Sequence, residues 1–109
     1  GSQLCTAGLV VRTAFAEEHP EAVTAFLAEY ADSTAWVNDN VSEAAQLVGQ
    51  YDIVDAAVAE KAIPYCNIVC LTGDEMKAAV SGYLTVLYDQ NPKSVGGALP
   101  GDDFYYGAQ

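Results

Sequence analysis

The sequence predicts a mainly α-helical fold with one or two short strands. Four stretches carry apolar residues at steps of three and four, which is the period of one helical face. Only residues 9–13 and 65–71 combine short length with the apolar, β-branched residues of a strand. We therefore expect four helices and at most two strands in the 109 residues.

The first element is expected to be a strand from Leu9 to Thr13, which follows Gly8. A buried strand needs hydrogen-bonding partners for its backbone N–H and C=O groups. The second candidate strand, residues 65–71, lies far along the chain and is not an obvious partner. The unpaired strand indicates that the chain is a fragment of a larger protein.

The first helix is expected to begin at the sequence "HPEAV". Proline suits the first helical turn because its missing N–H would be unpaired there, and Glu21 complements the helix dipole. The segment Asn38–Asn40 ends the helix. Its apolar face consists of Val23, Phe26, Leu27, Tyr30, Ala31, Thr34 and Val37.

Two shorter helices are expected to follow. Ser42 is predicted to cap a helix with the sequence "EAAQLVGQY". The next helix begins near Val54 and Asp55 and runs until Pro64, which cannot continue a helix. The sequence "YCNIVCL" after Pro64 is expected to be extended or a short strand.

The last helix has a predicted capping box at its start. In "TGDE", the Thr72 hydroxyl can accept from the N–H of Glu75 while Glu75 reaches back. Asn91 and Pro92 end the helix. Its apolar face consists of Met76, Ala79, Val80, Tyr83, Leu84, Leu87 and Tyr88. Tyr83, Tyr88 and Trp36 are expected to be core or interface positions.

The predicted organisation has three parts. Residues 1–8 are a remnant of tag removal and a leader, residues 9–92 are one helical domain, and residues 93–109 are a Gly- and Pro-rich tail. Phe104, Tyr105 and Tyr106 are expected to dock the tail on the domain.

Composition narrows the classes of partner. Fifteen acidic and four basic residues give a net charge of −11, which would repel nucleic acid and an anionic membrane surface. Hydrophobic residues make up 51%, so the chain has material for a core. No stretch has the ~18 apolar residues of a membrane span, and residues 1–8 lack signal-peptide features.

The cysteines are expected to be buried free thiols. In an extended "CNIVC", Cys66 and Cys70 would lie ~13 Å apart, and a disulfide needs Cα atoms within about 7 Å. A disulfide from Cys5 to either one stays open, whereas a metal site is not expected.

No enzymatic group or cofactor site is expected. His19 is a helix-boundary residue without a neighbouring nucleophile, and Glu17-Glu18 and Asp102-Asp103 lie at element edges. The sequence "VGGALPG" lacks the Lys-Ser/Thr of a phosphate-binding loop.

The order of these segments carries a resemblance. The sequence "LVVRTAFAEEHPEAVTAFLAEYADSTAWVNDNVSEAAQLV" resembles the late part of substrate-binding proteins of ABC importers. The similar group is the nitrate/sulfonate/taurine type, which includes pyrimidine-precursor binders. The sequence from "AIPYCNIVCLTGDEM" to "DDFYYG" is similar to the closing segment of one branch. The similarity extends from about Leu9 to Gly107.

The resemblance implies a fragment of a two-lobed α/β fold, the periplasmic-binding-protein type II fold. The intact protein would be a membrane-anchored extracellular lipoprotein or a periplasmic protein. It would capture a small solute between its lobes by hinge closure and deliver it to a membrane permease. The strand 9–13 would then belong to a sheet formed upstream.

Few ligand contacts can be expected from this part of such a protein. The candidates are Arg12, Tyr65 and Asn67. Arg12 could equally form a salt bridge with Glu17 or Glu18. The fragment is expected to dimerise through residues 9–13 or its apolar helix faces.

The alternative function is a small helical protein–protein interaction module. It would remain monomeric until its partner binds, whereas a fragment would cover its apolar faces by self-association. The two classes can therefore be distinguished by the oligomeric state of the chain.

Overall fold

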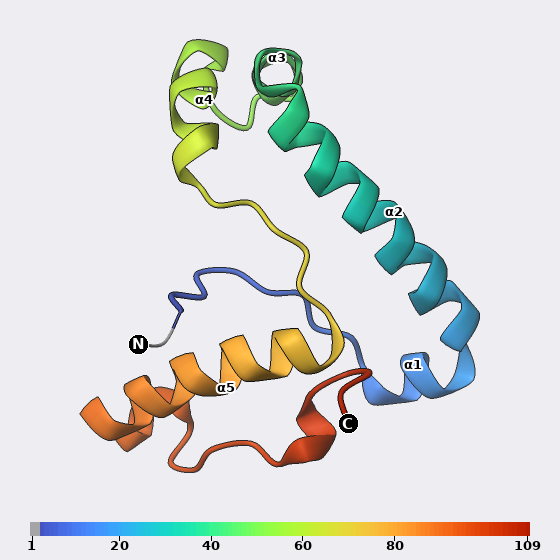
Figure 1. Ribbon diagram of the computed structural model, residues 1–109, viewed down its shortest axis with the longest axis vertical. Coiled ribbons are helices and arrows are strands. Elements are labelled where there is room, and N and C mark those ends of the chain that lie inside the picture. The colour runs from blue at the N-terminus through green and yellow to red at the C-terminus, as the bar shows by residue number, and fades with distance from the viewer. Residues whose placement is uncertain (1–2) are drawn as a thin grey trace. The chain divides into compact units, whose positions relative to one another are not determined.

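The computed structural model describes residues 3–109 and is mainly helical in that range (Figure 1). The helices are α1 (Thr13–Glu18), α2 (Pro20–Asp39), α3 (Val41–Gln50), α4 (Ala56–Ala62), η1 (Ile63–Tyr65), α5 (Gly73–Gln90), η2 (Pro92–Val95) and η3 (Asp102–Phe104). Those labelled η are 3-10 helices. The prediction of a mainly α fold is confirmed.

Neither predicted strand is present within residues 3–109. Residues 9–12 are irregular, and Thr13 already begins α1 because the C=O of Arg12 accepts from the N–H of Ala16 at 3.1 Å. Of residues 65–71, Tyr65 belongs to η1 and the others are irregular. A strand requires a neighbouring strand, and the described part of the chain supplies none to either segment.

The chain divides into two compact units. One contains residues 11–70, and the other contains the segment up to Val10 together with residues 71–109.

In residues 11–70, α2 begins and ends where its local signals place it. Pro20 is its first residue, with Glu21 in the first turn, and the N–H of Asn40 closes its last turn on the C=O of Trp36. Asp55 caps α4 by accepting from the N–H groups of Ala57 and Val58. The expected starts of these two helices are therefore confirmed.

The predicted cap of α3 is wrong. α3 begins at Val41 with Asn40 as its N-cap, so Ser42 lies inside the helix. The Ser42 hydroxyl instead donates to Oε1 of Glu60 on α4, at 2.6 Å. The hydroxyl that was predicted to cap α3 is thus bound by a residue that is distant in sequence. Pro64 also does not end the helical conformation. It lies within the 3-10 helix η1, where its missing N–H is tolerated.

The core of this unit lies between α3, α4 and η1. Its buried residues are Ala44, Ala45, Ala59 and Ile63, and Ala45 is fully inaccessible. Val37, Val41, Val48 and Ile68 pack against them. Because three of the four are alanines, the helices approach closely but bury little side-chain area.

Gly49 of α3 lies against Ala56, the first residue of α4. A Cβ at Gly49 would lie 2.9 Å from Cβ and 3.2 Å from the backbone N of Ala56. An alanine in an open helix stabilises by up to about 1 kcal/mol relative to glycine. Here we expect Gly49→Ala to destabilise by about 1–2 kcal/mol, because the backbone of α4 has to shift. Urea unfolding of G49A beside Q50A, an exposed position on the same helix, measures this; a more stable G49A would contradict the contact.

In the other unit, the predicted capping box of α5 is wrong in its hydrogen bonds. Thr72 is the N-cap, but its side chain makes no capping bond. Asp74, in the first turn, accepts from the backbone N–H of Gln109 at 2.7 Å. The far end follows the prediction, since α5 ends before Asn91, whose side chain accepts from the N–H of Lys93.

The C-terminal segment docks on α5 mainly around Lys77. Nζ of Lys77 lies 3.0 Å from Oδ1 of Asp102 and 5.9 Å from the ring centroid of Tyr105, and donates to the C=O of Gln109 at 3.4 Å. Tyr105 is buried, with 7% exposed, whereas Phe104 and Tyr106 are 58% and 41% exposed. Of the three aromatic residues, Tyr105 is therefore the one that packs against α5, and the other two stay at the surface.

The ion pair of this docking site contributes little. Asp102 is 92% exposed, so water screens its attraction to Lys77. We expect Asp102→Asn to lower the free energy of unfolding by less than about 1 kcal/mol, with the difference vanishing in high salt. Urea unfolding at low and high sodium chloride, with Asp103→Asn as the matched control, measures both. A larger loss that persists in salt would mean that Asp102 acts other than by charge.

Candidate functional site

An open apolar groove of about 390 Å³ lies on the surface of residues 11–70. We call it the α2–α3 groove. It is lined by Ser33, Trp36, Val37, Ala44, Leu47, Val48, Tyr51, Ile53, Ile63 and Ile68. All but Ser33 are apolar or aromatic, so the groove offers a surface for burial rather than for chemistry.

Helical periodicity produces the lining. On α2, Ser33 and Trp36–Val37 follow at steps of three and four. On α3, the steps from Ala44 to Leu47 and on to the C-cap Tyr51 do the same. These positions therefore share one face of each helix. The two helices join at Asn40, the C-cap of α2 and N-cap of α3.

The side-chain amide of Asn38 forms two hydrogen bonds at one edge of the groove. Nδ2 of Asn38 donates to the C=O of Ile68 at 2.8 Å and to the C=O of Thr34 at 3.1 Å. The irregular segment after η1 is thereby attached to α2. This bond places Ile68 beside the α2 face, which the sequence does not indicate because 30 positions separate the two residues.

The larger lining side chains remain accessible. Trp36 and Leu47 are 38% and 42% exposed, and Tyr51 and Ile53 exceed 70%. Surface residues of this kind are common singly, but here they converge on one hollow. The groove is thus an apolar surface that the residue 11–70 unit itself does not cover.

A second hollow, of about 580 Å³, lies at the turn from α3 to α4. Its lining is mostly polar and consists of Gln46, Gly49, Gln50, Asp52, Val54, Asp55 and Ala56. Asp55 is already engaged as the cap of α4, and Asp52 has a left-handed backbone, φ +56°, which aspartate tolerates in turns. The hollow contains no pair of a nucleophile and a base.

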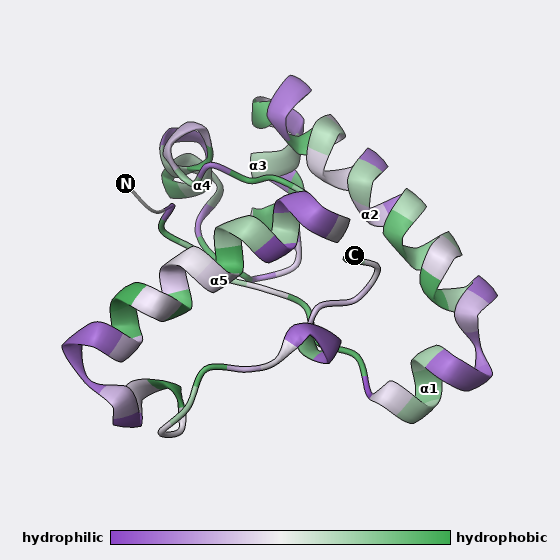
Figure 2. Ribbon diagram, turned by 60° about the horizontal axis from the view of Figure 1, so that its bottom comes forward, coloured by the Kyte–Doolittle hydropathy of each residue, from purple (hydrophilic) through white to green (hydrophobic). Residues whose placement is uncertain are grey.

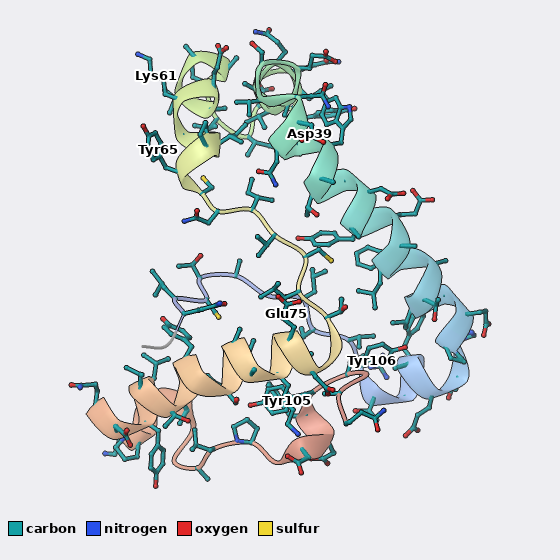
Figure 3. All side chains as sticks on the ribbon, in the orientation of Figure 1. Asp39, Lys61, Tyr65, Glu75, Tyr105 and Tyr106 are labelled. Atoms are coloured by element: carbon teal, nitrogen blue, oxygen red, sulfur yellow. The ribbon has the colours of Figure 1, made fainter. Side chains whose placement is uncertain are left out.

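The three residues expected to contact a ligand line neither hollow. Arg12 is exposed at the N-cap of α1, and no ion pair joins it to Glu17 or Glu18 in the described chain. Tyr65 projects from η1 and is 84% exposed (Figure 3). Asn67 is exposed in the following irregular segment, with φ +51°. Their role in ligand binding stays a prediction.

Sequence patterns pointed to Trp36 as a core or interface position but not to the groove. The signal for the groove lining is that two successive helices each carry apolar residues at i, i+3, i+4 spacing. Ile53 carries no such pattern because it lies in the turn between α3 and α4.

The three cysteines are free thiols. The expected burial is wrong, because Cys66 is exposed and Cys5 and Cys70 are only half-buried. Sγ of Cys66 donates to the C=O of Ala62 at 3.3 Å. Across residues 3–109, no three His, Cys, Asp or Glu side chains gather as metal ligands. None of the helices described there combines the length and apolar character needed to cross a membrane.

Comparison with known proteins gave no match to a family model, a curated protein or a solved structure. The residues and surfaces of the chain itself therefore carry the functional argument.

Proposed function

We propose that the chain is the C-terminal part of the solute-binding component of an ABC importer, of the nitrate/sulfonate/taurine type. The supporting observation is the amount of apolar surface that each unit leaves uncovered. Large exposed side chains include Trp36, Leu47, Tyr51, Ile53 and Val58 in residues 11–70, and Leu4, Leu9, Val86, Leu99 and Phe104 in the other unit. Surfaces of this kind mark contacts with further protein.

The long helices also leave most of their apolar side chains uncovered, which supports the proposal. Hydrophobic and hydrophilic residues alternate along α2 and α5 (Figure 2), yet α2 buries only Val23 and Thr34, and α5 only Ala79. Phe26 stacks on Tyr30 with ring centroids 5.7 Å apart and is still 52% exposed. Units this small bury too little area to be strongly stable alone. Additional lobes of a two-lobed α/β protein would cover these faces.

In the intact protein, we propose that the two lobes close about a hinge on a small solute and deliver it to a membrane permease. The protein would be periplasmic, or an extracellular lipoprotein anchored to the membrane. Arg12, Tyr65 and Asn67 are exposed polar side chains that could contact the solute from this part. Binding would involve no covalent step, so no enzymatic activity is proposed.

A small helical interaction module is the second candidate, and the α2–α3 groove favours it. A groove formed by two helices and a turn is a common receptor for a partner helix. In that case the groove would be covered by a separate protein rather than by another lobe.

The first experiment examines the reading frame and its product. The reading frame that contains the chain is expected to continue upstream into strands alternating with helices. The intact product is then screened by thermal shift with nitrate, taurine and an aminopyrimidine. An increase in Tm with one of them supports the proposal. A frame that begins at this chain, or no response to any of the three solutes, contradicts it.

The second experiment measures self-association of the chain itself. We expect a dimer at high micromolar concentration by light scattering coupled to size-exclusion chromatography. Deleting residues 1–14 should yield a monomer or an aggregate, because Leu9, Val10 and Val11 are exposed and apolar. A dimer that survives deletion would place the contact on the helix faces. A monomer in both forms would favour the interaction module.

A further inference from the structure

The α2–α3 groove has an apolar lining and belongs to a unit that is rich in carboxylates. We propose that it binds an amphipathic helix whose apolar face is flanked by lysine or arginine. This inference rests on the second candidate function, in which a separate protein covers the groove of the residue 11–70 unit, and it names the chemistry of that partner.

The lining suits the apolar face of a helix. Trp36 and Leu47 extend from two helices that meet at Asn40, and Ile53 and Ile68 stand on irregular segments. A bound helix inserts apolar side chains one turn apart into such a groove. The 73% exposure of Ile53 and 72% exposure of Tyr51 leave area for the partner to cover.

The acidic charge of the residue 11–70 unit favours a partner helix with cationic side chains. Residues 11–70 contain ten carboxylates and only two cations, Arg12 and Lys61. The acidic residues are Glu17, Glu18, Glu21, Glu29, Asp32, Asp39, Glu43, Asp52, Asp55 and Glu60.

Three of these acids adjoin the lining directly in sequence. Asp32 precedes Ser33, Glu43 precedes Ala44, and Asp52 lies between Tyr51 and Ile53. All three are exposed. The acidic charge of this unit would attract a cationic flank on the partner, whereas an acidic flank would be repelled.

The same charges disfavour a second copy of the chain as occupant of the groove. Each copy carries a net charge of −11, so a contact through this face would bring acidic surfaces together. Self-association through residues 9–13 would not occupy the groove, because that segment contributes none of its lining.

Trp36 is the sole tryptophan of the chain and lines the groove, so its fluorescence reports occupancy. The probe is a Leu/Lys amphipathic peptide of about 18 residues, or five helical turns. We expect saturable binding with a blue shift of the Trp36 emission. Ile53→Ser should weaken binding about tenfold, and Val58→Ser, a similar change at an exposed position of α4 outside the lining, should leave it unchanged.

Two matched peptides separate the contributions. Replacing the lysines by glutamates should abolish binding, and replacing the leucines by glutamines should abolish the blue shift. The proposal is overturned by equal binding of the glutamate peptide, by equal binding of the glutamine peptide, or by an Ile53→Ser variant that binds as the parent does. It is also overturned if the blue shift develops with protein concentration alone, since a second copy would then fill the groove.

Discussion

Replacing Ile63 with alanine is expected to lower the free energy of unfolding of the residue 11–70 unit by about 2–5 kcal/mol. Ile63 is 7% exposed and packs with Ala44, Ala45 and Ala59. Because its three core neighbours are already small, they cannot fill the space that the lost side-chain atoms leave. A loss of this size is a large share of the stability of a small unit.

The matched control is the same change at Ile53, which is 73% exposed. Ile53→Ala should alter stability by less than about 0.5 kcal/mol, because its side chain is accessible to water before and after unfolding. Urea unfolding followed by Trp36 fluorescence reports on the unit that contains both residues. Equal losses of stability for the two variants would show that the buried Ile63 side chain contributes no more to stability than the exposed Ile53 side chain.

Replacing Tyr105 with alanine is expected to release residues 102–109 from α5. The ring is 7% exposed, forms an edge contact with Phe104 at 5.2 Å, and lies under Nζ of Lys77. Truncating a buried aromatic side chain costs about 3 kcal/mol of stability. This loss exceeds the stabilisation that an exposed ion pair can provide. Hydrogen exchange should therefore become faster at the N–H of Gln109, which donates to Asp74.

Tyr106→Ala provides the control, since Tyr106 is the adjacent residue and is 41% exposed. Its exchange rates at residues 102–109 should stay close to those of the parent protein. If both variants protect the N–H of Gln109 equally well, the polar contacts of Lys77 and Asp74 would hold the segment without the ring.

The helical elements were largely predictable because their signals are local. Pro20 and Glu21 begin α2, Asp55 caps α4, and Asn91 and Pro92 end α5. Each of these effects depends on a residue and its neighbours within one helical turn. They therefore act wherever the helix comes to lie in the fold.

The errors share a physical origin, which is that the outcome depends on groups outside the local segment. Residues 9–13 have strand-forming side chains, but strand formation needs a second strand. Ser42 could cap a helix, but Glu60 binds its hydroxyl. The predicted capping box at Thr72 and Glu75 fails while Asp74 accepts from Gln109, 35 positions away.

The candidate site depends still more on tertiary contacts. The repeat of apolar residues specified which face of α2 and of α3 is apolar, and Trp36 was expected in a core or an interface. Local sequence alone thus predicted helices α2 to α5 and their amphipathic faces, whereas α1 was not predicted. Only the tertiary structure decided which faces are covered, because contacts such as Asn38 with Ile68 join residues 30 positions apart. The small alanine core covers so little that the α2–α3 groove remains open to solvent.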